Sequence, residues 1–242
     1  MKIVVLGGTG LIGRQLLARL RHAGHTAESA SPSSGVNALT AEGLAAALEG
    51  ADTLVDVTNS PSFEDRAVRH FFETSTHNLL AAAREAGPRH YVALSVVGAD
   101  RLPDSGYLRA KVLQERLIAG GGIPYTIVRA TQFFEFLAAV AQGSTTGDAV
   151  RVPPAFMQPI ASADVAAALA DTVLQPPVNG VVDIAGPERI RMDTLLQRVE
   201  TGGRPVIADP AATYFGAALA EDSLVPLGPA RLGPTTLAQW QA

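Results

Sequence analysis

Apolar residues recur along this chain in short β-branched runs, separated by longer stretches whose apolar positions repeat with helical period. Such runs predict strands, and the stretches between them predict amphipathic helices. The order of strand and helix, with strands that look buried on both faces, favours a parallel α/β sheet with right-handed crossovers. We expect strands near residues 3–6, 25–29, 53–57, 90–94, 125–128 and 181–185, and helices near 11–20, 40–48, 63–86 and 106–119.

The first strand runs directly into a turn with the spacing G-x-x-G-x-x-G. Gly7 permits a tight turn, Gly10 lets the backbone approach a ligand, and Gly13 lets the next helix pack closely on the strand. The helix N-terminus adds free N–H groups for an anion. This order predicts a phosphate cradle for a dinucleotide in a Rossmann-type, doubly wound sheet, and the alternative is a glycine-rich turn without a ligand. The candidate cofactor contacts in the turn are Gly7, Gly8, Thr9, Gly10, Leu11, Ile12 and Gly13.

A serine-rich loop follows the second predicted strand, where the adenosine ribose of a dinucleotide would lie. An acidic residue there would select NAD by binding the ribose 2′-hydroxyl. The loop has no acid, and Glu28 falls within the predicted strand rather than at its end. Ser31, Ser33 and Ser34, with Arg14 as a charge partner, could accept a 2′-phosphate instead. We therefore expect NADP(H) to be preferred over NAD(H), and the alternative is a solvated serine loop.

The carboxyl ends of the later strands are expected to line the same crevice. Asn59 and Ser60, with the proline that follows, are also ordinary turn chemistry, so a purely structural loop is the alternative. The candidate cofactor contacts at these strand ends are Val57, Thr58, Asn59, Ser60, Ala130 and Thr131.

Three polar residues suit carbonyl reduction. Ser95 follows the strand predicted at 90–94, and Tyr107 and Lys111 lie one turn apart on the helix predicted at 106–119. A carbonyl reduced by hydride needs a proton for its developing alkoxide, which a tyrosine can donate if a lysine ammonium tunes its pKa. The lysine can also bind the nicotinamide ribose, and the serine can orient the carbonyl. The alternative is that Tyr107 packs at the helix start and Lys111 is solvated.

The glycine turn, Ser95 and the Tyr107-x-x-x-Lys111 spacing together resemble the short-chain dehydrogenases/reductases. Residues 94–100, 107–111 and 159–166 are similar to the atypical, NmrA-like branch of small NAD(P)H-binding reductases. The resemblance covers nearly the whole chain and implies a Rossmann-type fold and hydride transfer at a Ser-Tyr-Lys site. Members of this branch that regulate rather than catalyse often lack the tyrosine, which is present here.

In the reductases that the chain resembles, the stretch after the strand predicted at 125–128 lies beside the nicotinamide and begins the substrate wall. Gln132, Phe133 and Phe134 occupy this stretch, and Phe156 and Met157 would face it. A wall rich in phenylalanine suits an apolar carbonyl compound or quinone, and the alternative is that these side chains belong to the core. We expect one NAD(P)-binding domain over residues 1–242, with a small C-terminal substrate lobe from 131–160 and 187–242, including helices near 192–200 and 213–220.

Composition and charge limit the classes of partner that we expect for this chain. A net charge of −4 and a pI near 5.7 give no electrostatic case for nucleic acid or an anionic membrane. No metal site is expected, because the chain has no cysteine and His70 and His77 lack supporting ligands. We expect no signal peptide, and the sequence has no apolar run of the ~18 residues that a membrane span needs. We expect a cytoplasmic protein with a small-molecule substrate, and an exposed apolar helix face could make it a homodimer.

The sequence thus predicts an NAD(P)H-dependent oxidoreductase that reduces a small apolar carbonyl compound or quinone with Ser95, Tyr107 and Lys111. Two other functions fit the same motifs. One is a non-catalytic, NAD(P)-binding redox sensor or regulator of the NmrA type, and the other is an isomerase or epimerase that retains its nicotinamide.

Overall fold

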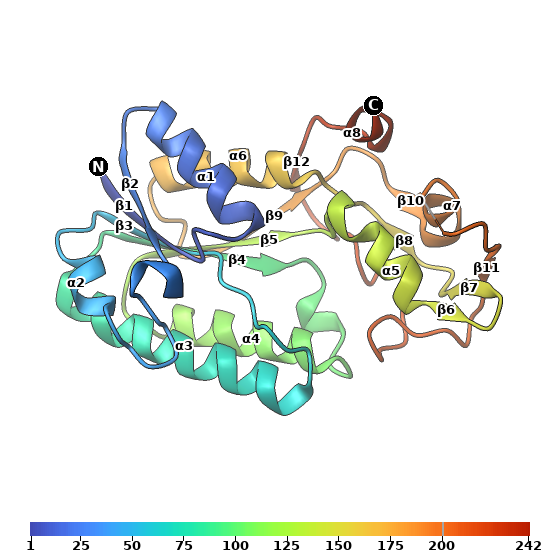
Figure 1. Cartoon of the computed structure of the whole chain (residues 1–242), viewed down its shortest axis with the longest axis horizontal. Helices are drawn as coiled ribbons and strands as arrows, with labels where there is room; N and C mark the ends of the chain where they lie inside the picture. The colour runs from blue at the N-terminus through green and yellow to red at the C-terminus, as the bar shows by residue number, and fades with distance from the viewer. Residues whose placement is uncertain (200) are drawn as a thin grey trace.

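The computed structural model describes residues 1–199 and 201–242. Its centre is a seven-stranded sheet in which every neighbouring pair of strands is parallel (Figure 1). This confirms the predicted Rossmann-type, doubly wound α/β fold. In spatial order the strands are β2 (Thr26–Ala30), β1 (Lys2–Leu6), β3 (Thr53–Asp56), β4 (His90–Val96), β5 (Tyr125–Ala130), β9 (Gly180–Ala185) and β12 (Ala230–Leu232).

Helices cover both faces of this sheet (Figure 1). One face carries α1 (Leu11–His22) and α6 (Ser162–Leu174). The other carries α2 (Leu44–Leu48), α3 (Asp65–Ala86) and α4 (Gly106–Ala119). Three single-turn 3₁₀ helices lie in the connections: η1 (Pro32–Ser34), η2 (Ala99–Arg101) and η3 (Phe134–Phe136).

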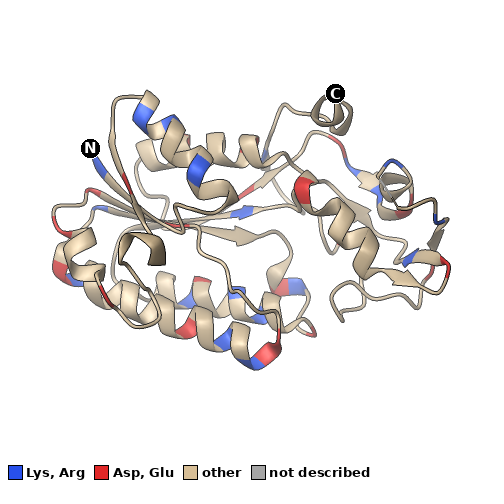
Figure 2. Cartoon of the chain, in the orientation of Figure 1, with Lys and Arg blue, Asp and Glu red and all other residues tan. Residues whose placement is uncertain are grey.

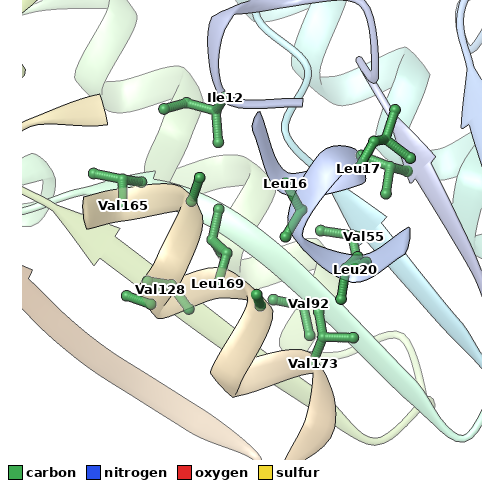
Figure 3. Close-up of a cluster of buried hydrophobic side chains, with 14 of the residues drawn as sticks. Ile12, Leu16, Leu17, Leu20, Val55, Val92, Val128, Val165, Leu169 and Val173 are labelled. Atoms are coloured by element: carbon green, nitrogen blue, oxygen red, sulfur yellow. The ribbon is translucent and has the colours of Figure 1, made fainter. Parts of the chain in front are cut away.

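The packing of α1 against α6 forms an apolar seam over the sheet. Leu16 and Leu20 of α1 and Leu169 of α6 are fully buried in one cluster (Figure 3). Val92 of β4 belongs to this cluster, whereas its neighbour Tyr91 is buried on the opposite face. Successive side chains of a strand point to opposite faces, so the apolar run of β4 supplies both layers.

The remaining elements gather at one end of the sheet (Figure 1). They pack around a second apolar cluster that includes Met157, Met192 and Leu196. These elements are α5 (Leu137–Gly143), β6 (Thr145–Thr146), β7 (Ala149–Val152), β8 (Phe156–Met157), β10 (Ile190–Arg191), α7 (Met192–Leu196), β11 (Val206–Ala208) and α8 (Leu237–Gln241). β6, β7 and β11 form a three-stranded sheet, and β8 pairs with β10 in antiparallel orientation.

Several predicted boundaries need correction. The helix expected near 40–48 begins only at Leu44, because Ala41 and Gly43 adopt positive φ angles of 63° and 72°. The helix expected near 213–220 is wrong: Phe215 and Gly216, also at positive φ, form a turn there. The helix expected near 192–200 ends at Leu196, and position 200 lies outside the described residues. Within the range 187–242 assigned to the lobe, β12 joins the main sheet.

The strand order fixes where a ligand crevice can form. The chain leaves β1 for β2 on one side and later returns to β3 on the other side. Such a topological switch point opens a crevice at the carboxyl ends of the strands involved. Gly7 follows β1 and Val57 follows β3, so the glycine turn and the loop after β3 meet at this crevice.

Charged residues are dispersed over the surface rather than gathered by sign. Figure 2 shows acidic and basic positions close together along α3 and α4. Arg69 pairs with Glu73 on α3 at 3.3 Å, and Arg109 of α4 pairs with Asp65 of α3 at 2.6 Å. Of the helices in the described residues, none has the length and apolar character needed to cross a membrane.

The seam between α1 and α6 gives a stability prediction. Leu169→Ala removes a fully buried side chain, so the free energy of unfolding is expected to fall by about 2–5 kcal/mol. Leu227, whose side chain is 67% exposed, provides the control: Leu227→Ala is expected to change it by less than about 0.5 kcal/mol. Urea denaturation followed by circular dichroism measures both, and equal losses would contradict the assigned core.

Candidate functional site

The glycine turn is shaped by contacts within the chain itself. Gly7 has a φ of +77°, and a Cβ there would lie 2.9 Å from the carbonyl oxygen of Val57. A Cβ on Gly13 would lie 2.3 Å from the carbonyl oxygen of Gly7, so only glycine lets α1 approach the turn this closely. A Cβ on Gly10 would meet only that same oxygen, at 3.3 Å. The packing therefore demands Gly7 and Gly13, while the space in front of Gly10 is open to a ligand.

The N-terminus of α1 opens onto this turn. Gly10 is its N-cap, no side chain caps the helix, and no acidic residue lies in its first turn. The first N–H groups of a helix have no partner within the helix, so they and the positive end of the dipole can receive an anion. Arg14 donates from Nη1 to the carbonyl oxygen of Thr9 at 2.9 Å, which holds its guanidinium beside the turn. These groups fit the diphosphate of a dinucleotide.

The serine-rich loop lies next to the glycine turn. Gly7 N donates to Ala30 O at 3.1 Å, which places Ser31 beside the turn. Ser31 and Ser34 bind each other's backbone N–H groups and cap η1, and the hydroxyl of the exposed Ser33 lies 3.1 Å from that of Ser31. Glu28 lies inside β2 as predicted and pairs with Lys2 Nζ at 3.7 Å, away from the strand end. Contact of a ribose phosphate with Ser33 of this loop, or with Arg14 beside the glycine turn, stays a prediction.

Hydrogen bonds within the chain and partial burial hold the loop after β3. Asp56, the last residue of β3, accepts hydrogen bonds from Thr58 N at 3.0 Å and Thr58 Oγ1 at 2.7 Å. The Ser60 hydroxyl donates to Ser62 O at 2.7 Å and is buried. Val57 packs partly against the core, and Asn59 is the exposed residue among the four predicted contacts. Contact of this loop with a cofactor stays a prediction.

Tyr107 stands at the start of α4, in an aromatic setting. Ser105 caps the helix by accepting from Leu108 N at 3.5 Å. The Tyr107 ring lies 5.4 Å from the ring of Phe63 and 6.1 Å from that of Phe72. Burial raises the pKa of Tyr107 to about 12, so the phenol is protonated at neutral pH.

Lys111 is buried rather than solvated. Its ammonium donates to the carbonyl oxygen of Leu94 at 2.9 Å and to the side-chain oxygen of Gln114, and lies 4.5 Å from the centre of the Phe72 ring. Burial lowers the pKa of Lys111 from 10.5 to about 8, although the carboxylates of Asp56 and Glu115 act in the opposite direction. Tyr107 and Lys111 therefore share Phe72, and the idea of a solvated Lys111 is wrong.

Ser95 lies inside β4, because this strand continues to Val96. Its hydroxyl donates to Glu115 Oε1 at 2.5 Å. Arg129 binds both oxygens of the same carboxylate in a bidentate pair, with Nε–Oε1 and Nη2–Oε2 distances of 2.9 and 2.6 Å. The Ser95 proton thus points at Glu115, and orienting a carbonyl would require the hydroxyl to rotate.

The predicted residues at the end of β5 and directly after it are buried or partly buried. Ala130 and Thr131 are buried, and the Thr131 hydroxyl donates to Gln158 O at 2.6 Å. Gln132 Oε1 is buried without a hydrogen-bond partner among the described residues. Contact of Gln132 with a substrate stays a prediction.

The predicted substrate wall is partly core. Phe134 and Met157 are 3% and 0% exposed and belong to the apolar cluster of the lobe. Phe133 is only partly buried, and its ring stacks with that of Phe136 at 5.6 Å. Phe156 is also partly exposed, with the Arg189 guanidinium 4.0 Å from its ring centre. Phe133 and Phe156 are therefore the accessible members of the predicted wall.

The structure adds four polar residues to the predicted site. Gln114 and Glu115 follow Lys111 on α4 by three and four positions, a spacing that puts them on its face. Asp56 and Arg129 are charged residues at the ends of otherwise apolar strands, which is the one signal the sequence offers for them. Their partners become evident only when β3, β4 and β5 are placed side by side.

A family model described as NAD(P)H-binding matches residues 7–176. The chain is 26% identical over 151 residues to the photosystem II assembly factor Ycf39 of Synechocystis sp. (strain ATCC 27184 / PCC 6803 / Kazusa), covering 57% of this chain and 46% of that protein. It thus spans about half the length of that relative. The matched range begins directly after β1 and includes the glycine turn, β2, β3, β4 and β5.

Two further comparisons cover more of the chain. A (4-alkanoyl-5-oxo-2,5-dihydrofuran-3-yl)methyl phosphate reductase of Streptomyces griseus subsp. griseus is 29% identical over 224 residues, covering 84% of this chain and 75% of that one. The solved structure of MoeE5 in complex with UDP-glucose and NAD superposes with a TM-score of 0.73 at 18% identity, covering 98% and 95% of the two chains. The second likeness shows that the two chains share a fold.

The open space at Gly10 gives a binding prediction. Gly10→Ala is expected to leave the fold intact and to weaken binding of NADPH and NADH at least tenfold, because its Cβ would stand where the diphosphate approaches. Gly143→Ala, with no atom within 4 Å of the added Cβ, is the control that should bind normally. Fluorescence titration measures affinity, and unchanged binding by Gly10→Ala would contradict the cradle.

Proposed function

The chain belongs to the NAD(P)H-binding family, as the resemblance to the atypical short-chain dehydrogenases/reductases predicts, and we propose that it reduces a small apolar carbonyl compound or quinone. A nicotinamide cofactor bound at the crevice would supply the hydride. The observation that carries this proposal is the placing of Tyr107 and Lys111 one turn apart around Phe72, at the start of a helix that follows the carboxyl end of β4. This is the sheet edge that also carries the glycine turn.

Tyr107 is the proton donor in the proposed reaction. Burial raises the pKa of its phenol to about 12, the opposite of the lowering expected from Lys111, so the proton would pass only to a stronger base such as a developing alkoxide. Lys111 would place a positive charge on the same helix face, where it stabilises the tyrosinate left after transfer. Ser95 would orient the carbonyl once its hydroxyl turns from Glu115. These are the roles predicted from the three residue types.

An apolar substrate suits the accessible aromatic rings. Phe133 and Phe156 are partly exposed rings, and Arg189, which lies over the Phe156 ring, is paired with Asp222. The Streptomyces relative is named as a reductase of a compound that carries an oxo group and a phosphate. We expect this chain to share the reductase chemistry and to favour a substrate without the phosphate.

A change in Tyr107 tests the proton transfer. Tyr107→Phe is expected to lower kcat by about 10²–10⁴-fold, the usual contribution of a general acid, with NADPH affinity nearly unchanged. Tyr125→Phe is the matched control, since Tyr125 lies at the opposite, amino end of β5 and should leave turnover intact. Loss of NADPH absorbance with a panel of carbonyls and quinones measures turnover. Full activity in Tyr107→Phe would remove it from the mechanism.

Cofactor choice follows from the groups near Ser31. We expect NADPH to bind more tightly than NADH, because Ser33 and Arg14 can receive a 2′-phosphate and no acid lies at the strand end. Arg14→Gln should weaken NADPH about tenfold and NADH little. Arg19→Gln, an exposed arginine on the same helix, is the control. Calorimetric titration of each variant with both cofactors measures the two affinities. Tighter binding of NADH than of NADPH by the unaltered chain would contradict the expected preference.

A second candidate, an NAD(P)-binding regulator without turnover, is favoured by one observation. The Ser95 proton and the Lys111 ammonium both have buried partners within the chain. Cofactor binding without oxidation of NADPH by any carbonyl or quinone of the panel would support this candidate over the reductase.

A further inference from the structure

Asp56 is a buried carboxylate with a full set of donors. It is 0% exposed at the carboxyl end of β3. Oδ1 accepts both hydrogen bonds of Thr58, and Oδ2 accepts from Gln114 Nε2 at 2.9 Å and from Tyr91 OH at 3.2 Å. Three of these donors are neutral side chains and one is a backbone N–H, so no cation of the described residues pairs directly with Asp56.

Gln114 connects this carboxylate to a buried ammonium. It is 1% exposed; its Nε2 donates to Asp56, and its Oε1 accepts from Lys111 Nζ. An ammonium can only donate and an ionised carboxylate can only accept, so the orientation of the amide between them is determined by chemistry. The three side chains form a directed chain of hydrogen bonds from Lys111 to Asp56.

The buried Lys111 ammonium and the buried Asp56 carboxylate compensate each other's charge. A buried ion is costly unless a counter-charge and hydrogen bonds compensate it. The other nearby carboxylate, Glu115, is held on both oxygens by Arg129 and also accepts from Ser95. Asp56 is therefore the counter-charge left for Lys111, one amide away.

We propose that Asp56 and Gln114 are positioning residues for Lys111: they fix its ammonium beside Phe72 and link it to the loop that begins at Thr58. The catalytic consequence rests on the proposed function, whereas the positioning itself is a property of the free protein. Because Asp56 Oδ1 holds Thr58, the same carboxylate orders a predicted cofactor contact and the candidate lysine.

The titration of Lys111 can be measured directly, because Lys2 and Lys111 are the only lysines of the chain. With ¹³Cε-labelled lysine, each gives one NMR signal whose shift follows its own titration. The groups that face Lys111 are Asp56 on β3, Tyr91 and the Leu94 carbonyl on β4, Phe72 on α3, and Tyr107, Gln114 and Glu115 on α4. Lys2, at the far end of β1, is the internal reference.

Gln114→Leu and Asp56→Asn each remove one part of the chain of hydrogen bonds. Each is expected to move the Lys111 titration to lower pH than in the unaltered protein, because the ammonium loses an acceptor or its counter-charge. Each should also lower kcat at least tenfold. Gln15→Leu, which removes a part-buried glutamine from α1 on the other face of the sheet, should leave the Lys111 titration in place.

A double variant reverses the direction of the hydrogen bond between positions 56 and 114. In Asp56→Asn with Gln114→Glu, the new amide can donate to the new carboxylate, which accepts from Lys111, so the net charge and the number of bonds are kept. The Lys111 titration and kcat are expected to return toward those of the unaltered protein. This coupling makes the double variant informative even where a single variant fails to fold.

The outcomes separate positioning from mere stability. If the single variants lower only the melting temperature, with the Lys111 titration unmoved, or if the folded double variant titrates like an exposed lysine, the positioning role is overturned. A chain that turns over no substrate fails the proposed reductase function, yet the titrations of Gln114→Leu and Asp56→Asn still decide this inference.

Discussion

The contact on which the rest of the site depends is the approach of α1 to the first strand. The Cα of Gly13 lies against the carbonyl of Gly7 with no room for a side chain. This closeness brings the uncapped start of α1 to the carboxyl edge of the sheet, directly over the switch point between β1 and β3. The anion-binding end of the helix and the ends of the strands that carry polar side chains are therefore parts of one surface.

The two faces of the sheet differ in the interactions that their side chains make. The face under α1 and α6 is an apolar seam in which leucines and valines interlock (Figure 3). The face under α4 carries charged and amide groups next to the apolar core: Asp56, Gln114 and Lys111 in one chain of hydrogen bonds, Glu115 and Arg129 in an ion pair. Such groups are tolerated because each has its partners. The first face stabilises the fold, and the second holds the candidate chemistry.

The sequence predicts what depends on local rules. The helix Gly106–Ala119 has the predicted bounds, because Ser105 caps its start and glycine follows its end. The glycine turn is likewise set by short-range spacing. The start of α2 is not, since Ala41 takes a positive φ that no residue preference indicates. The partners of Ser95 and Lys111 also escape prediction, because they depend on the rotation of α4 over β3, β4 and β5 rather than on any pattern along the chain.

The edge of the main sheet bears on how the chain can fold during synthesis. β12 is only three residues long and pairs with β9 alone, yet it is supplied by residues 230–232. Until that segment leaves the ribosome, β9 presents a row of unpaired backbone groups to which another nascent chain could add. The glycine turn and its helix lie at the opposite side of the sheet and can assemble earlier. The last strand is thus the cover that closes an aggregation-prone edge.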